Sequence, residues 1–102
     1  MTIAESDWKK FKELRAVALE RLSQKVLDEC EAICRKGSTT PHEKYLELYK
    51  MVQERDDQMA KAFNIFSRST ATLSLRLMVV QGLVNNEELS RFSEEVQRIV
   101  GA

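Results

Sequence analysis

Residues 40–66 read TPHEKYLELYKMVQERDDQMAKAFNIF and carry the clearest helical pattern of the chain. Thr40 can cap a helix, Pro41 suits its first turn, and Glu43 completes a capping box. Apolar residues then recur at steps of three and four, as they do on one face of an amphipathic helix. This apolar stripe comprises Tyr45, Tyr49 (or Leu48), Val52, Met59, Phe63 and Phe66. We therefore predict a helix over 41–66.

Asp56 interrupts this apolar stripe at a position that is in register with its other members. A carboxylate that faces a core must be paired, protonated or hydrated, because burying it bare costs several kcal/mol. We expect a buried ion pair with Arg76, for which Arg55 and Arg68 are substitutes. The alternative is a ligand-binding or catalytic site centred on Asp56, Arg55 and Arg76. If Asp56 is paired and buried, its replacement by alanine should destabilise the fold by about 3 kcal/mol or more.

The segment before this helix contains no glycine or proline as far as Gly37. Its apolar residues also recur with helical spacing, which predicts a helix over about 3–36. Thr2, or else Ser6 or Asp7, is expected to cap its start. Gly37 is expected to end it in a left-handed conformation.

A third helix is predicted over about 69–81, ended by Gly82. Residues 73–77 alternate apolar and polar, which is a strand pattern, but a lone strand would leave its backbone groups unpaired. We therefore favour a helix, whose apolar residues surround most of its circumference. Such a helix should be the central, most buried element.

A fourth helix is predicted over about 86–100, with Asn85 as its cap and Glu88 completing a capping box. Ser93, which is followed by two glutamates, can restart a helix. A kink at Ser93 would therefore be consistent with the pattern.

The lengths of the first two helices set the overall shape. At 1.5 Å per residue they are roughly 45 and 39 Å long, whereas a compact protein of this size has a radius of gyration near 13 Å. We predict a single all-α domain over 1–102, in which helices 3–36 and 41–66 form a long antiparallel hairpin. The shorter helices 69–81 and 86–100 pack on one end of it as a helical bundle, and the turn at the other end stays uncovered.

The uncovered end is apolar on more than one face. Large exposed apolar patches on proteins mark interfaces, so we predict a homodimer in which two hairpin tips form a four-helix bundle. The alternative is a compact monomer in which the first helix kinks near Ser23–Gln24. The residues expected in the interface are Leu27, Leu46, Leu48, Tyr49 and Val52.

Charge and composition narrow the class of partner. The 16 basic and 16 acidic side chains cancel, whereas nucleic-acid-binding proteins usually carry a basic excess, so no nucleic acid is expected. The exception would be a local basic patch of Lys9, Lys10, Lys12 and Arg15. No apolar run approaches the roughly 20 residues that span a bilayer, and the first residues do not resemble a signal peptide. We therefore expect no membrane as a partner. Two cysteines form no disulfide framework, so we expect a cytoplasmic location.

The residue types that carry chemistry are few. Cys30, Cys34 and His42 are zinc-ligand types, with Glu31 or Glu43 as a fourth, but a Cys-x3-Cys spacing within a helix is not typical of closed zinc sites. Residues 67–70 (SRST) can present donors to a phosphate, yet they equally suit an ordinary helix cap. We therefore expect no metal, no cofactor and no catalytic residues. The leading hypothesis is a non-enzymatic protein–protein interaction module.

Overall fold

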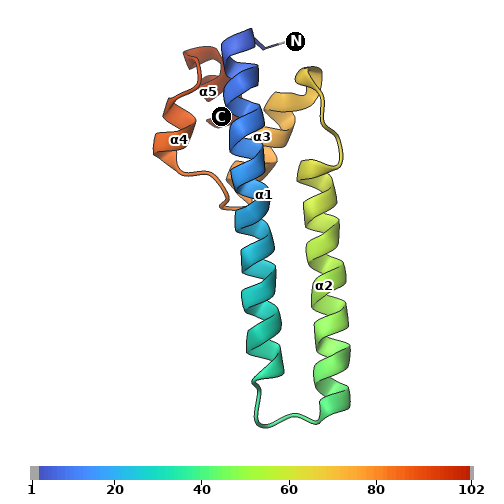
Figure 1. The fold of residues 1–102 in the computed structure, drawn as a ribbon. Helices are drawn as coiled ribbons and strands as arrows, with labels where there is room; N and C mark the ends of the chain where they lie inside the picture. Colours follow the sequence, from blue (N-terminus) through green and yellow to red (C-terminus); the bar gives the residue numbers. More distant parts are fainter. Residues whose placement is uncertain (1–2, 102) are drawn as a thin grey trace.

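The computed structural model describes residues 3–101, and helices are the only regular secondary structure in that range (Figure 1). The prediction of an all-α helical bundle is confirmed. Figure 1 shows a long pair of helices with the shorter helices packed at one end, and the second helix ends at Phe63 rather than at residue 66 as predicted. The elements are α1 (Glu5–Cys34), α2 (Pro41–Phe63), the single 3-10 turn η1 (Arg68–Thr70), α3 (Ala71–Val80), α4 (Asn86–Ser90) and α5 (Glu94–Gly101).

The antiparallel pair of α1 and α2 runs the length of the molecule (Figure 1). The molecule measures 52 × 24 × 22 Å, and its radius of gyration of 16.5 Å exceeds the roughly 13 Å of a compact 100-residue protein. Helix α1 continues unbroken through Ser23–Gln24, so the kinked alternative is wrong.

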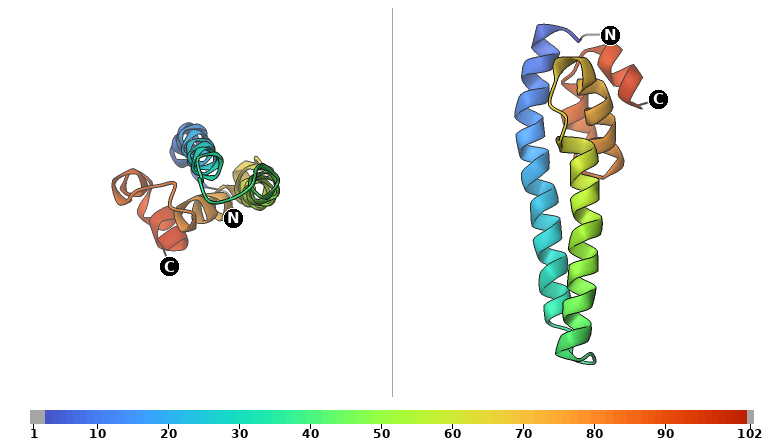
Figure 2. Two further views of the ribbon diagram at one scale, coloured as in Figure 1. Left: turned by 90° about the horizontal axis from the view of Figure 1, so that it is seen from below. Right: turned by 90° about the vertical axis from the view of Figure 1, so that its right-hand side faces the viewer.

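The hydrophobic core lies at the end of the hairpin where α3 packs against both long helices (Figure 2). Helix α5 covers α3 from the other side, so the core combines side chains from four helices and the loops between them. An aromatic layer closes its upper end, where the Trp8 and Phe66 ring centroids lie 5.2 Å apart. The buried core residues include Phe11, Leu14, Ala18, Leu22, Ala62, Phe63, Leu75, Met78, Leu83, Phe92, Val96 and Val100.

Two of the predicted helix starts are confirmed, although the start at Thr40 has only one of the two hydrogen bonds of the predicted capping box. The Glu43 amide donates to the Thr40 hydroxyl at 3.2 Å, and Pro41 occupies the first turn. Asn85 and Glu88 form the reciprocal capping box at the start of α4. The start of α1 differs, because Ala4 is its N-cap and no side chain caps it, so the prediction for Ser6 or Asp7 is wrong. The other predicted cap, Thr2, lies outside the described residues.

Helix α3 ends in a Schellman turn around Gly82, whose φ is +74°. The Leu83 amide donates to the Met78 carbonyl at 2.9 Å and the Gly82 amide donates to the Val79 carbonyl at 3.0 Å. Gly82 is the only residue between 3 and 101 with a positive φ. The left-handed conformation predicted for Gly37 is therefore wrong.

The predicted fourth helix is broken rather than continuous. Helix α4 ends at Ser90 and α5 begins at Glu94, so the restart expected at Ser93 is a full interruption. The Val96 amide donates to the Ser93 hydroxyl at 3.4 Å, which makes Ser93 the cap of α5.

Candidate functional site at the hairpin tip

The C-terminal end of α3 marks where the hairpin loses its third helix. There the Gln81 side chain donates to the Gln58 carbonyl of α2 at 3.0 Å, and the Lys25 ammonium of α1 donates to the Gln81 carbonyl at 3.4 Å. Beyond this level only α1, α2 and their connecting turn continue (Figure 1). We call residues 26–57 the hairpin tip.

The inner surfaces of the hairpin tip hold the two helices together. Ile33 and Met51 are its two buried residues. Glu29 of α1 pairs with Arg55 of α2, whose Nε lies 2.9 Å from a carboxylate oxygen, and Lys36 pairs with Glu47 near the turn. On the side below α3, a shallow groove of about 410 Å³ runs between the helices. Its lining is mostly charged: Glu29, Ala32, Ile33, Glu47, Lys50, Met51 and Glu54.

The outer surface of the hairpin tip is apolar and exposed. Tyr45, Tyr49 and Val52 follow one another at steps of four and three, so they share a face of α2. The rings of Tyr45 and Tyr49 stack with centroids 6.4 Å apart, and His42 extends the row at 6.3 Å from Tyr45. Of these residues Tyr45 is 60% exposed and Tyr49 is 56% exposed. We call Tyr45, Tyr49 and Val52 the aromatic ridge.

The residues predicted to form an interface lie in the hairpin tip. Leu27 of α1 is 61% exposed, Leu46, Tyr49 and Val52 of α2 are also exposed, and Leu48 is partly buried. An exposed leucine or tyrosine alone would be unremarkable, but here exposed apolar residues cluster on adjacent turns of two adjacent helices.

The prediction of a buried ion pair at Asp56 is wrong. Asp56 and Arg76 are both exposed, and neither makes a salt bridge within residues 3–101. Arg55 is bound by Glu29 instead. Asp56 does lie in register with the aromatic ridge, because it follows Val52 by four positions on the same face of α2. That half of the stripe is uncovered, so the carboxylate meets water. A ligand site centred on these residues stays a prediction.

The carboxylate that is buried is Asp7, with 2% of its surface exposed. It accepts hydrogen bonds from the Ser93 amide at 2.9 Å and from the Ser93 hydroxyl at 2.7 Å. Its charge lies in the first turn of α1 and against the start of α5, and the dipoles of both helices favour a negative charge there. The sequence offered Asp7 only as a cap, because its partner lies 86 positions away.

A second polar link that sequence reasoning missed joins α1 to α4. The Arg21 guanidinium binds both carboxylate oxygens of Glu88, at 2.6 and 2.8 Å, and also donates to the Leu83 carbonyl at 2.9 Å. The hydrogen bonds from Arg21, helped by the Asn85 amide, hold the pKa of Glu88 below its usual value. The same pairing raises the pKa of Arg21. Glu88 was identified as part of a capping box, but no sequence signal pointed to Arg21.

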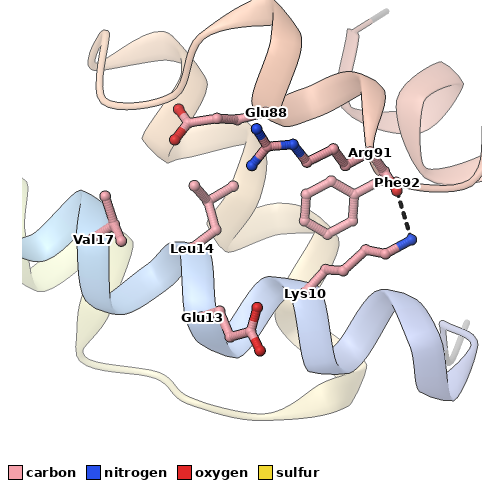
Figure 3. Close-up of a pocket in the computed structure, with 7 residues that line it drawn as sticks. All are labelled: Lys10, Glu13, Leu14, Val17, Glu88, Arg91 and Phe92. Atoms are coloured by element: carbon pink, nitrogen blue, oxygen red, sulfur yellow. Dashed lines mark hydrogen bonds between the residues drawn. The ribbon is translucent and has the colours of Figure 1, made fainter.

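A pocket of about 190 Å³ lies between α1 and α4. Figure 3 shows the side chains that line it. The apolar wall of the pocket comes from Leu14, Val17 and Phe92. The Lys10 ammonium closes one side by donating to the Arg91 carbonyl at 2.7 Å. Ligand sites for small molecules usually measure about 300–1,000 Å³, so this volume suits a single side chain better than a cofactor. The remaining lining residues are Glu13, Arg91 and Glu88, which is already bound to Arg21.

The side chains considered for zinc and phosphate have other surroundings. Cys34 is exposed, Cys30 is partly buried, and both are free thiols. Among residues 3–101 no three His, Cys, Asp or Glu side chains are grouped as metal ligands. In the segment considered for phosphate, Arg68 donates to the Ile3 carbonyl at 2.8 Å and pairs with Glu5. Its guanidinium thus ties η1 to the start of α1.

Three members of the basic cluster on α1 contact the protein itself. Lys10 binds the Arg91 carbonyl, Lys12 lies over the Trp8 ring, and Arg15 donates to the Phe63 carbonyl at 2.6 Å. The contacts of Lys10 and Arg15 join the first half of α1 to the end of α4 and to the end of α2, whereas the contact of Lys12 lies within α1.

Comparisons with known proteins assign this chain to no family. None of the helices described between residues 3 and 101 combines the length and the apolar character that crossing a bilayer requires. No known protein family, curated protein or solved structure gives a significant match to the chain.

Proposed function

We propose that this protein is a non-enzymatic interaction module that forms a homodimer through its hairpin tip. The observation that carries the proposal is the clustering of exposed apolar side chains on a part of the hairpin that no third helix covers. In the dimer, two hairpin tips pack face to face as a four-helix bundle. The interface is isologous, so both protomers contribute the same aromatic ridge to it.

The size of the hairpin tip sets the scale of the contact. At 1.5 Å per residue α1 extends about 14 Å through the hairpin tip and α2 about 26 Å, so at about 10 Å in diameter they present a face of roughly 400 Å². Two such faces bury roughly 800 Å², which is the size of a small, reversible interface. We therefore expect a modest dimer that dissociates on dilution.

The composition of the same surface is that of an interface with an apolar centre and a polar rim. Tyrosines are enriched at the centres of interfaces, and the aromatic ridge supplies two of them. Gln53 and Asp56 lie beside the ridge as polar rim residues, and the Gln53 amide already donates to the Tyr49 hydroxyl at 3.0 Å. The zero net charge of the chain leaves no overall repulsion between two copies.

A single charge insertion tests the proposal. Tyr49→Glu places a carboxylate in the apolar centre of both protomers, where burying it without a partner costs several kcal/mol. Because Tyr49 is exposed within one chain, the fold should persist, and circular dichroism checks this. We expect the dimer dissociation constant to rise about a hundredfold or more in sedimentation equilibrium.

Val80→Glu is the matched control, because it inserts the same charge at another exposed apolar residue, on α3 rather than in the hairpin tip. It should leave the dissociation constant within about threefold of the unmodified chain, a change of well under 1 kcal/mol. Equal weakening by both substitutions, or weakening by Val80→Glu alone, would place the interface elsewhere and contradict the proposal.

A further inference from the structure

Helix α3 carries a second exposed apolar surface, which lies outside the hairpin tip and begins where the hairpin tip ends (Figure 1). Val80 is 74% exposed and Leu73 is 59% exposed. They lie seven positions apart on the same side of the helix, with the partly buried Leu77 between them. We call Leu73, Leu77 and Val80 the α3 outer stripe.

This exposure is at odds with the character of the helix. A helix that is apolar around most of its circumference is usually buried on all sides. Helix α3 contacts α1, α2 and α5 and buries Ala71, Leu75 and Met78. Leu77 is partly buried and packs against the core at its edge, whereas Leu73 and Val80 stay exposed. Scattered exposed leucines need no explanation, but an apolar stripe along two turns of one helix resembles a helix-binding surface.

One charged side chain interrupts the α3 outer stripe. Arg76 is exposed, lies one position before Leu77, and makes no hydrogen bond or salt bridge in the part of the chain that the structure describes. Between Ala71 and Val80 there is no aspartate or glutamate to compensate it. The surface therefore combines apolar contacts with one uncompensated positive charge.

That charge argues against a second copy of α3 as the covering element. If two α3 helices packed antiparallel about a two-fold axis, Leu73 would oppose Val80 of the other copy and the axis would pass beside Arg76. Two guanidinium groups would then meet at the centre of an apolar contact with no acid between them. Like charges brought together in this way disfavour the complex.

We propose that the α3 outer stripe binds an amphipathic helix of a partner protein that carries a carboxylate in the middle of its apolar face. Its apolar residues, spaced at three and four, pack against Leu73, Leu77 and Val80. Its carboxylate accepts two hydrogen bonds from the Arg76 guanidinium, which suits a planar acid. This proposal is independent of the dimer, because the surface lies outside the hairpin tip.

A pair of synthetic peptides tests this proposal on the full chain. The first is an amidated helical peptide of about 18 residues, with leucines at steps of three and four and one glutamate amid them. The second has lysine in place of that glutamate. In a titration of isotope-labelled protein followed by amide chemical shifts, the glutamate peptide should shift amides of α3 and saturate. The lysine peptide should bind at least about tenfold more weakly.

Three variants at exposed positions identify the contacts without disturbing the core. Arg76→Glu should reverse the preference between the two peptides, because it inverts the charge that recognises them. Val80→Gln should weaken both peptides about tenfold, since glutamine keeps the helix but removes apolar contact. Tyr49→Glu, in the hairpin tip, should change neither affinity.

Several results would overturn the proposal. Chemical-shift changes confined to the hairpin tip would show that the peptides do not bind the α3 outer stripe. Equal binding of both peptides would show that the charge of Arg76 does not select between them. No binding of either peptide at millimolar concentration would rule out the α3 outer stripe as their binding surface. Shifts at α3 that grow with protein concentration alone, and that Val80→Gln abolishes, would identify a second copy as the occupant instead.

Discussion

Asp7 and Ser93 join the first turn of α1 to the start of α5 through two hydrogen bonds to one buried carboxylate. Removing the carboxylate would leave the Ser93 amide without its partner inside the protein. The resulting loss of stability depends on how deeply the hydrogen-bonded groups are buried, and not on the charge of the carboxylate alone. Exposed carboxylates such as Asp56 carry no comparable cost.

We therefore expect Asp7→Ala to lower the free energy of unfolding by about 2–3 kcal/mol, since it removes hydrogen bonds to a charged group. Asp56→Ala is the matched control and should change stability by less than about 0.5 kcal/mol. Urea unfolding of both variants measures the difference. A larger loss for Asp56→Ala than for Asp7→Ala would contradict the assignment of the buried carboxylate.

Glu88 gives the chain a specific sensitivity to acid. Its folded pKa lies below the ordinary value of 4.5, so its stabilising contribution is complete above that value. The contribution disappears as the pH falls through the folded pKa, because the protonated carboxyl no longer attracts Arg21. Unfolding free energies at pH 7 and pH 3 should therefore differ less in Glu88→Gln than in the unmodified chain. If the change in unfolding free energy between pH 7 and pH 3 were the same in Glu88→Gln and in the unmodified chain, Glu88 would not contribute to the acid sensitivity.

The sequence predicted a buried carboxylate but placed it at Asp56, whereas the structure buries Asp7. Asp56 does lie in register with an apolar stripe, but a stripe does not reveal which of its parts another helix covers. Asp7 gave no such signal, because its burial depends on Ser93 at the far end of the chain. Contacts between distant segments, including Arg21 with Glu88, come from the packing of whole helices and leave no local pattern.

At the scale of the helices, local signals predicted the starts of α2 and α4 and the end of α3, but neither the cap nor the end conformation of α1. The cap at Thr40 and the capping box at Asn85 satisfy backbone amides with nearby side chains, so the sequence carries the whole interaction. Helix α1 instead ends without a left-handed residue, although Gly37 stands two positions beyond its cap. A glycine permits a left-handed turn but does not require one.

The two glycines provide a matched test of this difference. Gly82→Ala forces a side chain into a conformation with φ of +74° and should destabilise the fold by about 1–2 kcal/mol. Gly37→Ala meets no atom within 4 Å and requires no positive φ, so it should be neutral or stabilise by up to about 1 kcal/mol. Thermal unfolding of both variants measures the contrast, which equal losses would contradict.

At the scale of the whole molecule, helix length predicted the shape. Two unbroken helices cannot fold into a sphere, and the observed length of 52 Å follows from that constraint. The short helices can cover only one end, which leaves the hairpin tip with its aromatic ridge exposed. The α3 outer stripe was not anticipated, because a helix apolar on all sides predicts full burial by its own chain.

The dimer formed by hairpin tips is tested most directly by the absolute mass of the unmodified chain in solution. Light scattering after size exclusion, over a hundredfold range of concentration, gives that mass without assuming a shape, which matters for an elongated molecule. We predict a mass of twice 11.8 kDa that falls only at the lowest concentrations. A mass of 11.8 kDa at every concentration would contradict the dimer.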